Sequence, residues 1–246
     1  MKKGEDAKKR GWQTFFGIVL TLGWILIALI VPQILIGFLI SYTLPVEMLH
    51  SPITTATFSL ISYIVSLVLV IYVPTKVPKI KDFLKSTRER LGITGLPTWT
   101  DIGLAPIGYI ATLIISAGLT ALFSLFPWFN SGESQNLGYS FYMQGFERGI
   151  AFIELAILAP VIEELIFRGF LYGNLRVKIP KWAAILIVSV LFGVVHLQWN
   201  VGVTVFAMSV VSCGLREITG TIYAGTLMHI INNTVAFYLL YVVGMG

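Results

Sequence analysis

Several ionisable side chains of this 246-residue chain lie in segments that are otherwise apolar. Glu163, Glu164 and Arg168 fall in the stretch APVIEELIFRG, and His196 and His229 fall in later apolar segments. Carboxylates and imidazoles are the groups that most often perform general acid–base catalysis. A charge at the centre of a membrane helix costs about 2.5–3.5 kcal/mol on insertion scales, so charges in such segments are functional candidates. These five residues therefore indicate a reactive site at membrane depth.

The spacing of the acidic residues predicts different roles for them. Glu164 and Arg168 are four residues apart with the acid first, which favours a self-contained ion pair on one helix face. Glu163 lies about 100° round the helix from Glu164, and its own i+4 neighbour is Phe167, so it has no local counter-charge. Its partner must come from another helix. Glu154, nine residues before Glu163, falls on the opposite side of the helical wheel, and we expect it outside the site.

The histidines are spaced in a similar way. Phe192 and His196 in FGVVH are four residues apart, as are His229 and Asn233 in HIINN. Three helices can therefore each present a polar face to one cavity. At 1.5 Å per residue, Glu163 and His229 lie about 14 Å, and His196 about 21 Å, from the cytoplasmic ends of their predicted helices, which allows a common layer near the middle of the membrane.

The composition predicts the fold that must position these residues. The chain is 56% hydrophobic and 12% charged, with a mean hydropathy of +0.84, whereas soluble domains are about 25% charged. We expect an all-α fold, a polytopic membrane helix bundle with about seven (six to eight) transmembrane helices in a single domain, residues 1–246. The predicted spans are residues 15–42, 54–75, 101–126, 149–172, 182–199, 201–217 and 220–244.

The net charge of +5 has a simple explanation in this fold. Basic residues cluster before the first span and between the second and third, which is the pattern of cytoplasmic loops, so the N-terminus is predicted to be cytoplasmic. No nucleic-acid partner is needed to explain it. The basic segment KIKDFLKSTRERLGI, residues 79–93, also carries apolar residues and predicts an amphipathic helix on the membrane surface.

The stretches EELIFR, FGVVH and HIINN follow the patterns E-E-x-x-x-R, F-x-x-x-H and H-x-x-x-N, in that order, on successive apolar segments. The ordered set resembles the CPBP family, which includes type II CAAX prenyl proteases and Abi-like bacteriocin-processing or immunity proteins, and the resemblance covers residues 149–244 as a catalytic core. It implies an intramembrane endopeptidase of a prokaryotic plasma membrane. The implied site residues are Glu163, Glu164, Arg168, His196, His229 and Asn233.

Peptide hydrolysis requires an activated water, stabilisation of the oxyanion and a proton for the leaving amine. We expect Glu163 to be the general base, with His196 orienting the same water. His229 and Asn233 would donate hydrogen bonds to the oxyanion, and the Glu164–Arg168 pair would hold the shape of the site.

Two alternatives remain open from the sequence. In a zinc-dependent mechanism, Glu163, His196 and His229 would be the metal ligands; the sequence has no H-E-x-x-H and Asn233 is a poor zinc ligand, so we favour a mechanism without a cofactor. In the other alternative, the protein is a non-enzymatic immunity or regulatory protein that binds a membrane peptide or partner protein.

The expected partners are a membrane-associated peptide or protein substrate and the lipid bilayer, with no nucleic acid. A transporter is disfavoured because no internal repeat is detectable.

Overall fold

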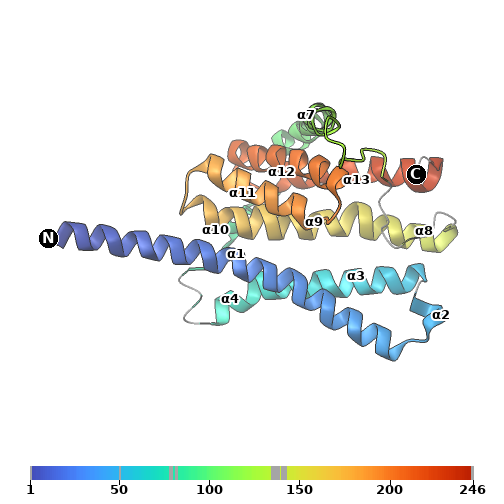
Figure 1. Cartoon of the computed structure of the whole chain (residues 1–246), viewed down its shortest axis with the longest axis horizontal. Coiled ribbons are helices and arrows are strands. Elements are labelled where there is room, and N and C mark those ends of the chain that lie inside the picture. The colour runs from blue at the N-terminus through green and yellow to red at the C-terminus, as the bar shows by residue number, and fades with distance from the viewer. Residues whose placement is uncertain are drawn as a thin grey trace.

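The structure is a computed structural model that describes residues 2–49, 51–77, 80, 83–133, 139 and 143–244. Every regular element in these residues is helical, so the all-α expectation is confirmed, and the helices form an elongated bundle (Figure 1). Five helices are long and apolar enough to cross a membrane, namely Gly11–Thr43, Pro52–Lys76, Trp99–Phe123, Trp199–Thr219 and Tyr223–Val243. Two further helical segments, described below, overlap the spans predicted at 149–172 and 182–199.

The N-terminal part is a helical hairpin. It comprises α1 (Lys2–Thr43), α2 (Val46–Leu49), α3 (Pro52–Leu67), the π-helical η1 (Val68–Tyr72) and α4 (Val73–Lys76). α1 and α3 pack side by side, and α1 extends past the other helices at its N-terminal end (Figure 1). The Trp24 indole donates a hydrogen bond to the carbonyl of Leu69 at 3.1 Å, which ties the two arms together.

A continuous central rod carries the two adjacent glutamates. It comprises α8 (Gly145–Phe152), η2 (Ile153–Leu158), α9 (Ala159–Glu163), η3 (Glu164–Tyr172) and α10 (Gly173–Arg176). Pro160 in the first turn of α9 cannot donate the helical hydrogen bond to Ala156, and wider π-helical turns lie on both sides of this short α-helix. Such turns change the direction in which later side chains point, and they are frequent at functional sites.

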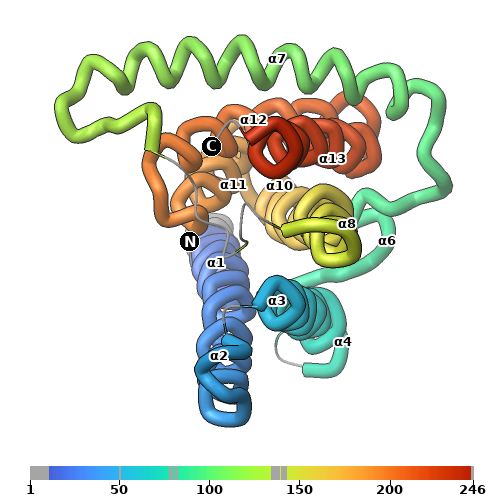
Figure 2. Tube along the Cα trace, turned by 90° about the vertical axis from the view of Figure 1, so that its right-hand side faces the viewer, coloured from blue at the N-terminus to red at the C-terminus, as the bar shows by residue number. Residues whose placement is uncertain are grey.

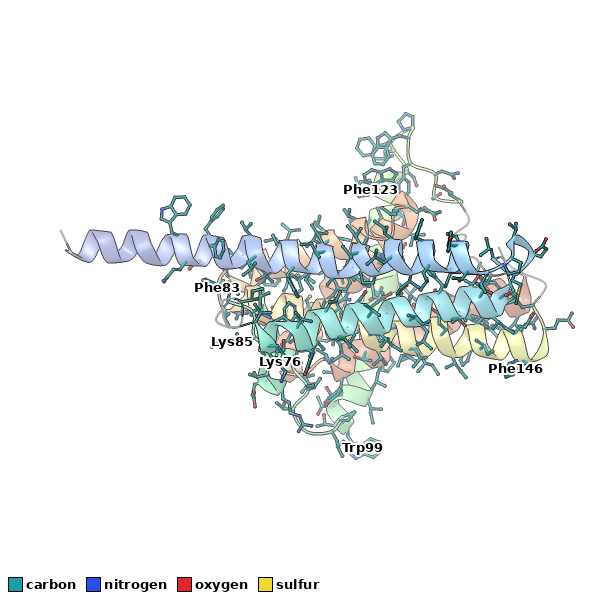
Figure 3. The ribbon with its side chains drawn as sticks, turned by 90° about the horizontal axis from the view of Figure 1, so that it is seen from below. Lys76, Phe83, Lys85, Trp99, Phe123 and Phe146 are labelled. Carbon is teal, nitrogen blue, oxygen red and sulfur yellow. The ribbon has the colours of Figure 1, made fainter. Side chains whose placement is uncertain are left out.

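The C-terminal part comprises α11 (Lys181–Val194), α12 (Trp199–Thr219), α13 (Tyr223–Tyr238) and the π-helical η4 (Leu239–Val243). α7 (Trp99–Phe123) packs against α12 and α13 and lies across them, as Figure 2 shows. Its two ends, labelled by Trp99 and Phe123 in Figure 3, project on opposite sides of the bundle. A capping box of Thr98 and Asp101 begins α7, and Asp101 also accepts a hydrogen bond from Thr221 at 3.1 Å, which fixes this end to the turn before α13.

The predicted surface helix over residues 79–93 is wrong for the part that the structure describes. Residues 84–87 are not helical, and α6 is a single turn, Arg88–Leu91. Leu84 and Leu91 are buried in the protein core instead of facing the membrane surface. The reason is that buried side chains bind the backbone of this segment: Asn174 bonds both the N–H and the carbonyl of Lys85, and Arg216 donates to the carbonyl of Arg90 at 2.6 Å.

Candidate active site

A cavity of about 420 Å³ lies between α3, the central rod, α12 and α13. Four of the six predicted site residues line it, namely Glu163, His196, His229 and Asn233. The other two, Glu164 and Arg168, are completely buried beside it and do not line it. The structure therefore separates the predicted set into groups that can touch a substrate and groups that support them.

Glu163 is the last residue of α9, and its two carboxylate oxygens have different neighbours. The Tyr63 hydroxyl of α3 donates a hydrogen bond to Oε1 at 2.7 Å. Oε2 lies 3.8 Å from Nε2 of His229 in α13. Both neighbours come from other helices, as the lack of a local counter-charge predicted.

Glu164 is the centre of a buried polar cluster. Its Oε1 lies 2.9 Å from Nη1 of Arg168, so the predicted i, i+4 ion pair is confirmed. The pair is not self-contained, however, because Ser212 of α12 donates to Oε2 at 2.8 Å and Nδ1 of His229 lies 3.3 Å from Oε1. Gly225 of α13 makes this approach possible, since a Cβ at that position would overlap the Ser212 hydroxyl.

His229 lies between the two glutamates, and this position determines which nitrogen of its ring carries a hydrogen. The Glu164 carboxylate is paired with an arginine and can only accept hydrogen bonds, so Nδ1 of His229 carries a hydrogen. Nε2 then faces Glu163 and the cavity.

His196 lies in the turn after α11, not within a helix. The predicted span at 182–199 is thus too long, because α11 ends at Val194. Nδ1 of His196 lies 2.7 Å from the carbonyl of Phe192, which can only accept, so Nε2 remains an acceptor in the neutral ring. Gly193 and Gly202 bring α11 and α12 into backbone contact beside this turn, since a Cβ on either would lie within 3.0 Å of the carbonyl oxygen of the other.

The Phe192 ring contacts one residue of each of the three motifs. It is completely buried, and the Arg168 guanidinium lies 4.2 Å from its centroid. The rings of His196 and His229 lie 5.0 and 5.9 Å from it, both edge to face. The arginine of the first motif, the aromatic residue of the second and the histidine of the third therefore pack as one unit.

Asn233 presents an amide to the cavity. Its Nδ2 donates to the carbonyl of Leu155 in the central rod at 2.9 Å, and its Oδ1 accepts from Asn232 at 3.2 Å. An amide nitrogen carries two hydrogens, so Nδ2 can donate to a second acceptor. Glu154 lies outside the cavity lining, is buried, and accepts a hydrogen bond from Tyr139 at 2.9 Å.

Sequence reasoning missed two residues that contact the glutamates, Tyr63 and Ser212. Each is one of several polar residues in its helix, and neither belongs to a motif with spacing of its own. A hydroxyl in a membrane helix usually bonds within the helix or to a neighbouring one. Only the packing of α3 and α12 against the central rod reveals their partners.

The zinc alternative was tested against the arrangement of these side chains. In the part of the chain that the structure describes, no three His, Cys, Asp or Glu side chains are grouped closely enough to hold a metal ion. Glu163 and His229 are neighbours, but His196 does not complete such a group with them. The arrangement does not fit a three-ligand zinc site, and we derive no step through a metal.

Comparisons with known proteins agree with the motifs. Residues 146–235 match the family model of the type II CAAX prenyl endopeptidase Rce1-like proteins. A relative in Bacillus subtilis (strain 168), named "Putative membrane peptidase YdiL", is 28% identical over 189 residues, which are 76% of this chain and 72% of the relative. No solved structure matches the chain. The resemblance to CPBP proteases that the three motifs indicate is confirmed.

Proposed function

We propose that this chain, with its Rce1-like segment, is an intramembrane endopeptidase that hydrolyses a peptide bond of a membrane-associated protein or peptide. The family match and the relative support a membrane protease. The observation that supports the specific mechanism is the Glu163 carboxylate, which lines a polar cavity among apolar helices with His229 beside it. We place this cavity in a prokaryotic plasma membrane, with the basic N-terminal end in the cytoplasm.

Glu163 acts as the general base in this proposal. Its Oε2 accepts a proton from a water molecule that also donates a hydrogen bond to Nε2 of His196. The oxygen of that water forms a bond to the carbonyl carbon of the substrate as the proton moves to Glu163. General base catalysis of this kind contributes about 10²- to 10⁴-fold to the rate.

The tetrahedral intermediate carries a negative oxygen, for which the cavity offers two donors. These are Nε2 of His229, when it carries a hydrogen, and the second hydrogen of the Asn233 amide, each worth about 10²- to 10³-fold in the rate. When the C–N bond breaks, the proton held by Glu163 passes to the leaving nitrogen. Glu163 is then a carboxylate again, and the products are one acid and one amine.

Substitution of Glu163 by Gln tests this assignment, because it removes the base with little change of shape. Membranes with wild-type protein or Glu163→Gln would be compared by proteomics to identify a substrate, and its cleavage by the purified proteins measured. The exposed Glu47→Gln on α2 is the matched control. We expect Glu163→Gln to fold and to lose proteolysis while the control retains it. Cleavage by Glu163→Gln at the wild-type rate would refute the assignment.

The role of a metal is decided by separate measurements. Under the glutamate mechanism, activity against the verified substrate persists after treatment with a zinc chelator, and the active protein contains less than stoichiometric metal by elemental analysis. Stoichiometric zinc whose removal abolishes cleavage, and whose return restores it, would replace the glutamate mechanism with the metal-dependent one.

A further inference from the structure

Tyr63 is the one residue of α3 among the described residues that line the cavity, and it contacts Glu163 directly. Its hydroxyl donates to Oε1 of Glu163 at 2.7 Å, a short hydrogen bond of the charge-assisted kind. It comes from the N-terminal hairpin and lies outside residues 146–235, which match the family model. The glutamate of the first motif therefore has a partner that the motifs do not contain.

The hydrogen bond makes the two oxygens of Glu163 unequal. Oε1 is held by the phenol, whereas Oε2 is directed to the side where His229 lies, 3.8 Å away. A glutamate side chain without such a partner can rotate about its terminal bond, which has broad torsional preferences. A base must be within hydrogen-bond reach of the proton that it removes, so the orientation of the carboxylate affects the rate.

The packing of α3 keeps the phenol in this place. Ser62 and Ser66, on either side of Tyr63 in the sequence, are buried, and small residues of this kind let membrane helices approach closely. α3 packs against α9, the short helix that ends at Glu163. The phenol and the carboxylate are thus brought together by the contact between α3 and α9.

We propose that Tyr63 is a positioning residue for Glu163: its hydroxyl holds Oε1 so that Oε2 faces the water and the scissile bond. The inference depends on the proposed function, because it assigns a role only if Glu163 is the base. Tyr63 takes no part in bond making or breaking, and no proton leaves it. It acts by restricting the orientation of the carboxylate.

Tyr63→Phe removes the hydroxyl and keeps the ring. We expect kcat for the verified substrate to fall about 10- to 100-fold, the effect of a small misplacement of a catalytic group, with KM unchanged within twofold. Tyr72→Phe is the matched control, since Tyr72 is an exposed tyrosine of η1, which directly continues α3, and it does not line the cavity. Rates are determined on monodisperse protein isolated by gel filtration, so that a loss of folded molecules is not counted as a loss of catalysis.

The outcomes separate this inference from the function on which it depends. A lower kcat with unchanged KM in Tyr63→Phe, and not in Tyr72→Phe, supports positioning. An unchanged kcat, a loss seen only in KM, or an equal loss in Tyr72→Phe overturns it. If Glu163→Gln is inactive and Tyr63→Phe is fully active, only the role of Tyr63 is rejected. If Glu163→Gln is fully active, Glu163 is not the general base, and the role of Tyr63 fails with that assignment.

Discussion

His229 binds the same carboxylate oxygen of Glu164 that Arg168 binds, at 3.3 and 2.9 Å respectively. The buried ion pair of the central rod therefore orients the imidazole of α13. Through this contact, a pair that does not line the cavity determines which nitrogen of His229 faces it.

Glu164→Gln should destabilise the protein strongly. The substitution leaves Arg168 completely buried without its counter-charge, and breaking a buried pair in this way costs about 3–5 kcal/mol. The measurement is thermal unfolding in detergent, with the exposed Glu47→Gln as the control. An unfolding temperature for Glu164→Gln equal to that of the control would show that the pair does not stabilise the fold.

Gly225→Ala should disturb the cluster around Glu164 without altering any charge. The new methyl group would overlap the Ser212 hydroxyl and approach Oε2 of Glu164 at 3.2 Å, and overpacking of this kind costs about 1–3 kcal/mol. The matched control is Gly214→Ala on α12, where a Cβ meets no atom within 4 Å. We expect lower stability and lower activity for Gly225→Ala only. Equal behaviour of the two variants would contradict the close packing of α12 on α13.

Asn233→Ala should lower kcat by about 10²- to 10³-fold, the usual effect of removing one oxyanion donor. Its contact with the Leu155 carbonyl is lost as well, so unfolding is measured in parallel to exclude a general loss of structure. The control is Asn130→Ala, an exposed asparagine that does not line the cavity. If kcat of Asn233→Ala equals that of the wild type, Asn233 does not donate a hydrogen bond to the oxyanion.

Lys178, in the connection between α10 and α11, predicts a pH dependence of stability. Burial, with a smaller contribution from Arg90, lowers the pKa of this lysine to about 8. In the unfolded chain its pKa is about 10.4, so between these pH values the unfolded state binds more protons and stability rises with pH. Thermal unfolding of wild type and Lys178→Met from pH 7 to 10 tests this. The rise should be smaller in the variant, and identical curves would exclude Lys178 as its source.

The site was largely predictable because its central residues lie at fixed spacings on long apolar helices. Glu164 and Arg168 are four residues apart, and this spacing alone was sufficient to predict their ion pair. The isolation of Glu163 likewise indicated a partner on another helix. Neither argument could identify Tyr63, because the contact between α3 and α9 depends on tertiary packing, for which a single tyrosine gives no periodic signal.

The segments 79–93 and 182–199 differ from their predicted helices for identifiable physical reasons. The charge pattern of residues 79–93 favoured a surface helix, but Asn174 and Arg216 bind the backbone of the described part and compete with helical hydrogen bonds. The span predicted over 182–199 is shorter in the structure, because the chain turns after Val194 and Leu197 adopts a positive φ of 56°. Hydropathy measures how apolar a segment is and contains no information about where its backbone turns.

The length of α11 has a consequence for biosynthesis. Its 14 residues span about 21 Å, which is less than the hydrocarbon thickness of about 30 Å, so α11 cannot cross a bilayer alone. The turn that carries His196 would expose unpaired backbone groups to lipid unless protein or water surrounded it. The backbone contact of Gly193 with Gly202 supplies part of that cover from α12. We therefore expect α11 and α12 to be inserted together, as one hairpin released from the translocon in a single step.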